Sequence, residues 1–169
     1  MTRIGLLSDT HSFLDESVND HFKECDEIWH AGDIGDHDVI AQLEKQKPVK
    51  AVFGNIDDKN IQQKFPEDLW MEVEGFTIWM THIGGTPPNY NPRVKKILDK
   101  KTPDIFICGH SHILKIMKDK ARNLLFINPG AAGNHGFHAI KTLVRFELHQ
   151  KEIKKMVVIE LGKRGALKS

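Results

Sequence analysis

Side chains that commonly bind metal ions follow five short apolar segments of this chain, at the point where each segment ends. The apolar segments 4–7, 28–29, 52–53, 78–80 and 105–108 are followed by Asp9 and His11, Asp33, Asn55, His82, and His110 with His112. Glycine precedes the ligand type in three of these places and lets the backbone turn sharply there. One such segment alone is common in ordinary turns, but five in succession predict a metal site.

The types of these seven side chains indicate which metal chemistry they suit. Two carboxylates, one amide oxygen and four imidazoles are too many ligands for one tetrahedral zinc, and they include no thiolate. They suit two divalent ions that share a bridging carboxylate and lie about 3.5–4 Å apart, as in two-metal hydrolytic sites. The two carboxylates and a bridging hydroxide would not neutralise all the positive charge of the two ions. The remaining positive charge favours an anionic substrate. We expect Mn²⁺, with Ni²⁺, Co²⁺, Fe²⁺, Zn²⁺ or Mg²⁺ as alternatives.

The elements that must position these side chains follow from the hydrophobic pattern. In the first half, strands are predicted at 3–8, 27–30 and 49–53 and helices at 15–24, 38–45 and 58–64, which is typical of a mostly parallel sheet. In the rest of the chain, a helix is predicted from 91 and strands at 69–74, 76–81, 104–108, 113–117, 124–127, 142–148 and 153–161, which predict a second sheet packed on the first. Because the carboxyl ends of parallel strands share one edge, the five segments should converge there.

Length and composition place limits on the function. We expect residues 1–161 to form one domain and residues 162–169 a basic tail. A hydrophobic content of 40% with 28% charged residues excludes a disordered chain, and a net charge of +1 gives no argument for nucleic acid or a membrane as partner. Two cysteines, Cys25 and Cys108, and the lack of a signal or spanning segment predict a cytoplasmic protein.

The ordered series Asp9-x-His11, Gly32-Asp33, Gly54-Asn55, His82 and Gly109-His110-x-His112 closely resembles the calcineurin-like metallophosphoesterase family over residues 3–160. The short chain and its Gly-Asn-x-Asp segment resemble the small YfcE-type phosphodiesterases of that family. The resemblance implies the α/β class, as a four-layer α/β/β/α sandwich of two mixed sheets flanked by helices. It also implies that Asp33 bridges the ions, with Asp9, His11 and His112 on one and Asn55, His82 and His110 on the other.

One position departs from the family pattern. Many members have a histidine directly after the motif asparagine, where it contacts the leaving-group oxygen, and this chain has Ile56 there. The smaller subgroup also lacks this histidine, so the general acid is unassigned. We take Asp33, Asn55, His110 and Asp57 as the catalytic candidates, although Asp57-Asp58 also suits a helix start. His21, His135, His138 and His149 have no ligand context in the sequence.

These observations predict a dinuclear metal-dependent phosphoesterase, and specifically a phosphodiesterase that hydrolyses P–O bonds through a metal-bridged hydroxide. A phosphomonoesterase or nucleotide pyrophosphatase on the same site is an alternative, and a non-catalytic protein-binding scaffold of the same fold is another. The expected partner is a small phosphorylated substrate. The near-neutral charge argues against nucleic acid, and a homo-oligomer is left open.

Overall fold

The first sheet has five strands in the order β12-β11-β1-β2-β3. The computed structural model describes residues 1–165, and in this sheet it gives β1 (Thr2–Leu7), β2 (Glu27–His30), β3 (Val49–Ala51), β11 (Ile140–His149) and β12 (Glu152–Lys163). Strands β1, β2 and β3 run parallel to one another, whereas β11 pairs antiparallel with both β1 and β12. The carboxyl ends of the three parallel strands therefore lie along one edge.

The second sheet also has five strands, in the order β4-β5-β8-β10-β9. Its members are β4 (Asp68–Val73), β5 (Phe76–Thr81), β8 (Ile105–Ile107), β9 (Lys115–Asp119) and β10 (Leu124–Asn128). Here β5, β8 and β10 are parallel, and β4 and β9 pair antiparallel at the two edges. A separate two-stranded hairpin joins β6 (Gly85–Thr86) to β7 (Asn89–Tyr90).

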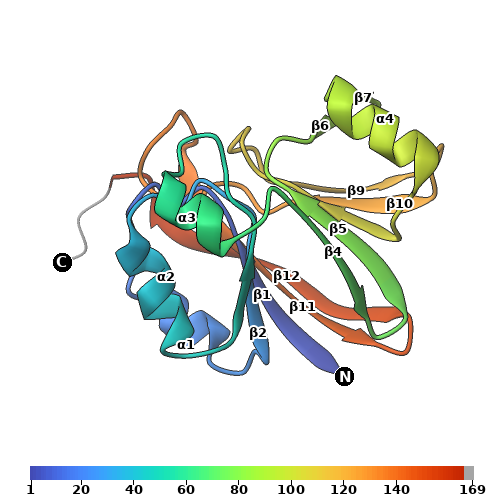
Figure 1. Ribbon diagram of the computed structural model, residues 1–169. Helices are drawn as coiled ribbons and strands as arrows, with labels where there is room; N and C mark the ends of the chain where they lie inside the picture. Colours follow the sequence, from blue (N-terminus) through green and yellow to red (C-terminus); the bar gives the residue numbers. More distant parts are fainter. Residues whose placement is uncertain (166–169) are drawn as a thin grey trace.

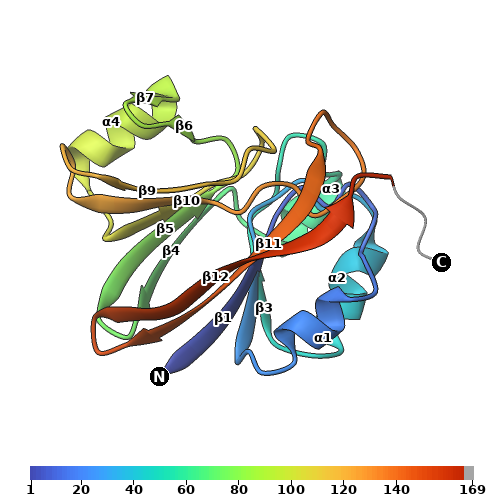
Figure 2. The same ribbon diagram turned by 180° about the vertical axis from the view of Figure 1, so that it is seen from behind.

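Helices cover the outer faces of the two sheets, as Figures 1 and 2 show. The helices are α1 (Val18–Phe22), α2 (His37–Glu44), α3 (Lys59–Lys64) and α4 (Pro92–Lys100). One apolar cluster joins residues of both sheets, a second joins the first sheet to α1, α2 and α3, and a third joins the second sheet to α4. Three apolar layers between four layers of structure confirm the predicted α/β/β/α sandwich.

The last two strands correct the predicted sheet assignment. We expected all strands of the C-terminal half to form the second sheet, but β11 and β12 return to the first sheet beside β1, as Figure 2 shows. Strand β11 lies between β12 and β1, and Val144 packs between the sheets while Leu143 packs on the helical side. Its apolar residues indicate a buried strand, but they do not indicate which sheet the strand joins.

The ends of two predicted segments also change. The helix predicted over 15–24 is α1 alone, because Asp15 forms a turn in which its carboxylate accepts hydrogen bonds from Ser17. Strand β12 continues through Lys163, two residues into the predicted tail, and residues 166–169 lie outside the described residues. None of the helices in the described part of the chain has the length and apolar character needed to span a bilayer.

Candidate metal centre

The loops after β1, β2, β3, β5 and β8, which carry the seven candidate ligands, meet at one end of the two sheets (Figure 1). Two groups have all their ligand atoms within 4.8 Å of one another. The groups are Asp9, His11 and His112, and Asp33, His82 and His110. Asn55 joins the second group through its Oδ1, which lies 3.0 Å from Nδ1 of His110.

Buried polar atoms without a partner show how well these groups fit metal ions. Within residues 1–165, six buried side-chain nitrogen or oxygen atoms have no hydrogen-bond partner, and three of them are Asp9 Oδ1, His11 Nε2 and His82 Nε2. The Nε2 atoms of His11 and His82 lie 3.3 and 3.2 Å from Asp33 Oδ2, and Nε2 of His112 lies 3.2 Å from Asp9 Oδ1. Leaving such atoms buried and unpaired is costly, and two divalent cations would satisfy them.

The protein holds one oxygen of each carboxylate and leaves the other oxygen to face the cluster. Oδ2 of Asp9 accepts hydrogen bonds from the Ser8 hydroxyl at 2.7 Å and from the His110 backbone N–H at 3.1 Å. Oδ1 of Asp33 accepts from the Ile56 backbone N–H at 3.1 Å. The remaining oxygens, Asp9 Oδ1 and Asp33 Oδ2, are the ones nearest the imidazoles. The arrangement suits Asp33 as a ligand shared between the two groups.

The surroundings of Asp33 and His82 prepare these two side chains to bind a cation. Burial disfavours the charged form of Asp33, but the nearby nitrogens of His11 and His82 outweigh it and hold the pKa of this carboxyl well below its usual range. Nδ1 of His82 lies 2.7 Å from the Ala31 carbonyl oxygen, which can only accept, so Nδ1 carries the proton. The lone pair of His82 is therefore on Nε2, the nitrogen that faces the cluster.

The backbone of the ligand loops is unusual. Asp9, His11, Asp33, His110 and His112 all have positive φ angles, between 44° and 70°. Non-glycine residues adopt this conformation at an energetic cost, and such strain gathers at functional sites. Five of the seven candidate ligands therefore depend on the surrounding loops to hold them.

Asp57 is one residue that holds these loops. Its buried carboxylate accepts hydrogen bonds from the backbone N–H groups of Gly35 at 2.8 Å, Gly54 at 2.7 Å and Ile34 at 3.2 Å. It thus ties the loop after β2 to the loop after β3. Asp57 does not line the cavity at the cluster, and Asp58 is the residue that caps α3. Asp57, a catalytic candidate from the sequence, therefore has a supporting role in the loops around the cluster.

Gly54 is required in the loop after β3 because the chain passes close to Asp33. A Cβ atom at position 54 would lie 2.1 Å from Oδ1 of Asp33 and 2.4 Å from its backbone nitrogen. Both neighbours are fixed, one by its role in the cluster and the other by the backbone. The glycine of the Gly54-Asn55 segment therefore allows Asn55 to reach the cluster.

His30 supports the Asp33 loop from beneath and is fully buried. Its Nδ1 accepts from the Gly32 backbone N–H at 3.1 Å, so Nε2 carries the proton and donates to the Thr10 hydroxyl at 3.0 Å. That hydroxyl donates to the Ile34 carbonyl at 2.9 Å. Burial lowers the pKa of His30 from 6.5 to about 3, so the ring is neutral at physiological pH.

We expect His30 to make the metal-free protein less stable as the pH falls. Below pH 6.5 the His30 ring of the unfolded chain binds a proton. In the native protein the same ring stays neutral until the pH approaches about 3. The free energy of unfolding should therefore fall by up to about 1.4 kcal/mol per pH unit across this range. Urea unfolding with chelator, compared between wild type and His30→Asn, measures this slope. The variant should give a shallower slope and the exposed control His37→Asn an unchanged one, and equal slopes in all three would refute the assignment.

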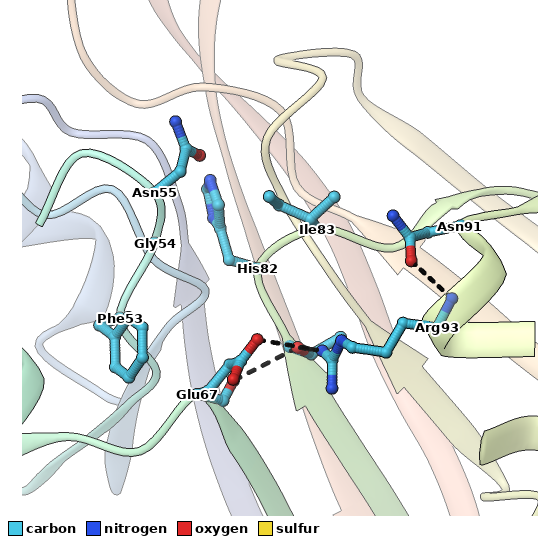
Figure 3. Close-up of a pocket in the computed structure, with 9 residues that line it drawn as sticks. Phe53, Gly54, Asn55, Glu67, His82, Ile83, Asn91 and Arg93 are labelled. Atoms are coloured by element: carbon cyan, nitrogen blue, oxygen red, sulfur yellow. Dashed lines mark hydrogen bonds and ion pairs between the residues drawn. The ribbon is translucent and has the colours of Figure 1, made fainter. Parts of the chain in front are cut away.

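Two cavities open beside the cluster. The larger, of ≈ 530 Å³, is lined by the following residues: His11, Asp33, Asn55, Ile56, His110, Ser111, His112, Ile113, His135, Gly136, Phe137 and His138. The smaller, of ≈ 350 Å³, lies on the side of Asn55 and His82 and extends to Arg93 and Glu67, as Figure 3 shows. The Arg93 guanidinium is held by the Asp68 carboxylate at 2.9 and 3.1 Å.

His135 and His138 lie at the cluster, although no pattern in the sequence predicts them there. The ring of His135 stacks on His11 with centroids 4.7 Å apart, and the ring of His138 meets His112 edge to face at 5.3 Å. His138 is held by the Gly133 carbonyl oxygen, 2.7 Å from its Nε2. Both belong to the loop between β10 and β11, which has no hydrophobic period, so only the return of β11 to the first sheet brings it here.

Asn128, which the sequence suggests only as part of a turn, supports the loop that carries His110 and His112. Its amide nitrogen donates to the Gly109 carbonyl and to the Ser111 hydroxyl, both at 3.0 Å, and its Oδ1 accepts from the Gly130 backbone N–H. Asn128 therefore fixes the His110 loop by side-chain contacts that connect two strand ends.

Comparison with known proteins identifies the family. Residues 2–151 match the model of the calcineurin-like phosphoesterase superfamily domain. The chain belongs to this superfamily. A probable metallophosphoesterase of Methanothermobacter thermautotrophicus is 30% identical to this phosphoesterase-family chain over 135 residues, which is 76% of each chain. The family match and the fold thus confirm the resemblance found in the sequence.

Solved structures of other proteins share the fold of this chain. An archaeal phosphodiesterase superposes with a TM-score of 0.72 at 21% identity and covers 93% of this chain and 99% of its own. Vps29 of Entamoeba histolytica, solved in complex with Zn²⁺, superposes with a TM-score of 0.75 at 16% identity and covers 94% and 98% of the two chains. At these identities the likeness concerns the fold.

Proposed function

We propose that this protein is a dinuclear metal-dependent phosphodiesterase. The observation that supports this most is the pairing of two ligand groups around Asp9 and Asp33, in which three buried atoms, Asp9 Oδ1, His11 Nε2 and His82 Nε2, have no hydrogen-bond partner. Asp9, His11 and His112 would hold one ion, and His82, His110 and Asn55 the other, with Asp33 shared between them. Mn²⁺ is the metal we propose, and the nitrogen and oxygen donor set without sulfur is compatible with it as well as with Ni²⁺, Co²⁺, Fe²⁺ and Zn²⁺.

The two ions, when bound, would supply a nucleophile at neutral pH and neutralise charge on the phosphoryl oxygens. The chain's own residues fix the geometry in which this takes place. The hydrogen bonds to Asp9 Oδ2 and Asp33 Oδ1 keep both carboxylates in one orientation, and the Ala31 carbonyl keeps His82 in one tautomer. Such fixed groups need no reorganisation as charge develops on the substrate.

Hydrolysis of bis(p-nitrophenyl) phosphate tests the proposal. We expect no turnover after chelation and restored turnover on addition of Mn²⁺, while metal analysis should give two ions per chain. Phosphomonoesters and nucleotide pyrophosphates assayed beside it test the two alternative substrate classes on the same site. Absence of turnover with Mn²⁺, Ni²⁺, Co²⁺, Mg²⁺ and Zn²⁺ alike would contradict the proposal.

Turnover should depend steeply on the leaving group, because Ile56 occupies the position at which many family members have a histidine. A positioned general acid contributes about 10²–10⁴-fold, and it matters most when the departing alkoxide is basic. A series of aryl and alkyl phosphodiesters should show rates that fall as the pKa of the leaving group rises. Ile56→His should flatten this dependence, whereas the conservative control Ile56→Val should leave it unchanged. A flat dependence in the wild type, with chemistry rate-limiting, would mean that another acid serves.

A non-catalytic protein-binding scaffold is the second candidate, since Vps29 proteins share the fold and the loops around the cluster expose apolar side chains. The complete series of seven ligand types favours the enzyme.

We further propose that the protein works in the cytoplasm on a small phosphodiester. The free and buried state of Cys25 and Cys108 supports this location.

A further inference from the structure

Apolar side chains surround the candidate metal centre at its opening. Ile56 follows Asn55, Ile83 follows His82, Ile113 follows His112, and Phe137 lies between His135 and His138. We call these four residues, Ile56, Ile83, Ile113 and Phe137, the apolar rim. Their exposed fractions are 45%, 37%, 65% and 104%. Eight large apolar residues are exposed in the described part of the chain, so half of them stand around this one site.

The rim residues line the same cavities as the ligands. Ile56, Ile113 and Phe137 line the larger cavity, and Ile83 lines the smaller one, where Figure 3 shows it next to His82. Asn55 lines both cavities. A phosphoryl group at the ligand cluster would thus have the rim directly beside its ester oxygens.

The larger cavity lacks the cations that further phosphates would need. Among the described residues that line it there is no lysine or arginine. In the smaller cavity Arg93 is neutralised by Asp68, and Glu67 lies 3.7 Å away. A polyphosphate or a nucleic-acid chain would therefore have charges without protein partners here.

The residues of the larger cavity instead suit a planar aromatic group. His135 already stacks on His11 there, and the neighbouring Phe137 offers a fully exposed ring. Gly136 allows this approach: its φ is +129°, and a Cβ atom would lie 2.2 Å from Nδ1 of His112. The loop therefore places an aromatic side chain next to a ligand residue, where aromatic pairs gain from offset or edge contacts.

From these contacts we infer that the apolar rim binds an uncharged aromatic ester group of the substrate in the larger cavity. The inference rests on the proposed phosphodiesterase function and narrows it to aryl or similarly planar apolar phosphodiesters. Phe137 and Ile113 are the residues that determine this specificity. They are expected to contribute to binding of the ester group and not to the chemistry at phosphorus.

Binding of phosphonates tests the inference without turnover, because a P–C bond is not hydrolysed. Calorimetry with the Mn²⁺-loaded protein should show phenylphosphonate binding about 10-fold more tightly than methylphosphonate. Phe137→Ala and Ile113→Ala should each reduce this preference several-fold and leave the affinity for methylphosphonate unchanged. Val158→Ala, at an exposed apolar position on β12 outside both cavities, is the matched control and should retain the full preference.

Kinetics separate this inference from the proposed function. With p-nitrophenyl phenyl phosphate and p-nitrophenyl methyl phosphate the leaving group is the same, so Phe137→Ala should raise KM for the phenyl diester about 10-fold and change kcat little. Turnover of both diesters with equal KM, or equal affinity for the two phosphonates, would overturn the inference and leave the phosphodiesterase intact. A Phe137-dependent phosphonate preference without any turnover would support the aromatic site and reject the enzyme. If neither phosphonate binds, the aromatic site is rejected.

Discussion

Replacing Asp33 by asparagine is expected to abolish most of the activity. One donor to a transition-state oxyanion is worth about 10²–10³-fold, and Asp33 is proposed to hold both ions, so turnover should fall by about 10³-fold or more. The asparagine keeps the shape of the side chain and can still accept the hydrogen bond from the Ile56 N–H, so the fold should survive. Turnover of bis(p-nitrophenyl) phosphate, metal content and circular dichroism together measure this.

The matched control for that experiment is Asp38→Asn. Asp38 is an exposed carboxylate in the first turn of α2 and contacts Gln42, away from the cluster. This variant should keep both metals and wild-type turnover. If Asp33→Asn behaved in the same way as Asp38→Asn, then Asp33 could not be the shared ligand, and Asp9 would be the next carboxylate to test.

Asp57→Asn should weaken the loops without acting on the chemistry directly. The amide of asparagine has a single oxygen, so at least one of the N–H groups of Ile34, Gly35 and Gly54 loses its acceptor. Hydrogen bonds to a charged group contribute about 1.5–3 kcal/mol each, and we expect a loss of about 3 kcal/mol in unfolding free energy. For a chain of this size that corresponds to a fall of roughly 10 °C in melting temperature. Metal affinity should fall by about 10–100-fold.

The neighbouring carboxylate provides the control for this second experiment. Asp58 caps α3 by accepting from the Ile61 N–H, and asparagine is an equally good cap, so Asp58→Asn should leave melting and metal affinity near wild type. Leaving-group dependence decides between the two roles considered for Asp57. A steeper dependence in Asp57→Asn, with stability and metal affinity unchanged, would restore Asp57 as the general acid.

The convergence of the candidate ligand residues could be predicted because their position follows from a rule about strand ends. Asp9, Asp33 and Asn55 end parallel strands of one sheet, while His82 and His110 end parallel strands of the other. Parallel strands place their carboxyl ends at a common edge whatever the packing details are. The apolar residues of each strand and the residue type that follows them are therefore enough to predict where these side chains meet.

The roles of Asp57, Asn128, His135 and His138 could not be predicted for the opposite reason. Asp57 and Asn128 act through hydrogen bonds to the backbone of distant loops, and such contacts leave no period or spacing in the sequence. The two histidines reach the cluster only because β11 pairs with β1. The apolar residues of β11 indicate a buried strand but not its neighbour, so the sequence does not place the loop before it along either sheet.

The crossing from β10 in the second sheet to β11 in the first separates the parts of the site that can change from those that cannot. Residues 135–138 of this crossing line the larger cavity yet contribute none of the seven candidate ligands. Insertions and substitutions there would alter which ester groups fit while the ligand loops stay as they are, because surface loops tolerate such changes. A library confined to His135, Phe137 and His138, with Gly136 kept because a side chain there would press on His112, should therefore yield altered substrate preferences with retained metal loading.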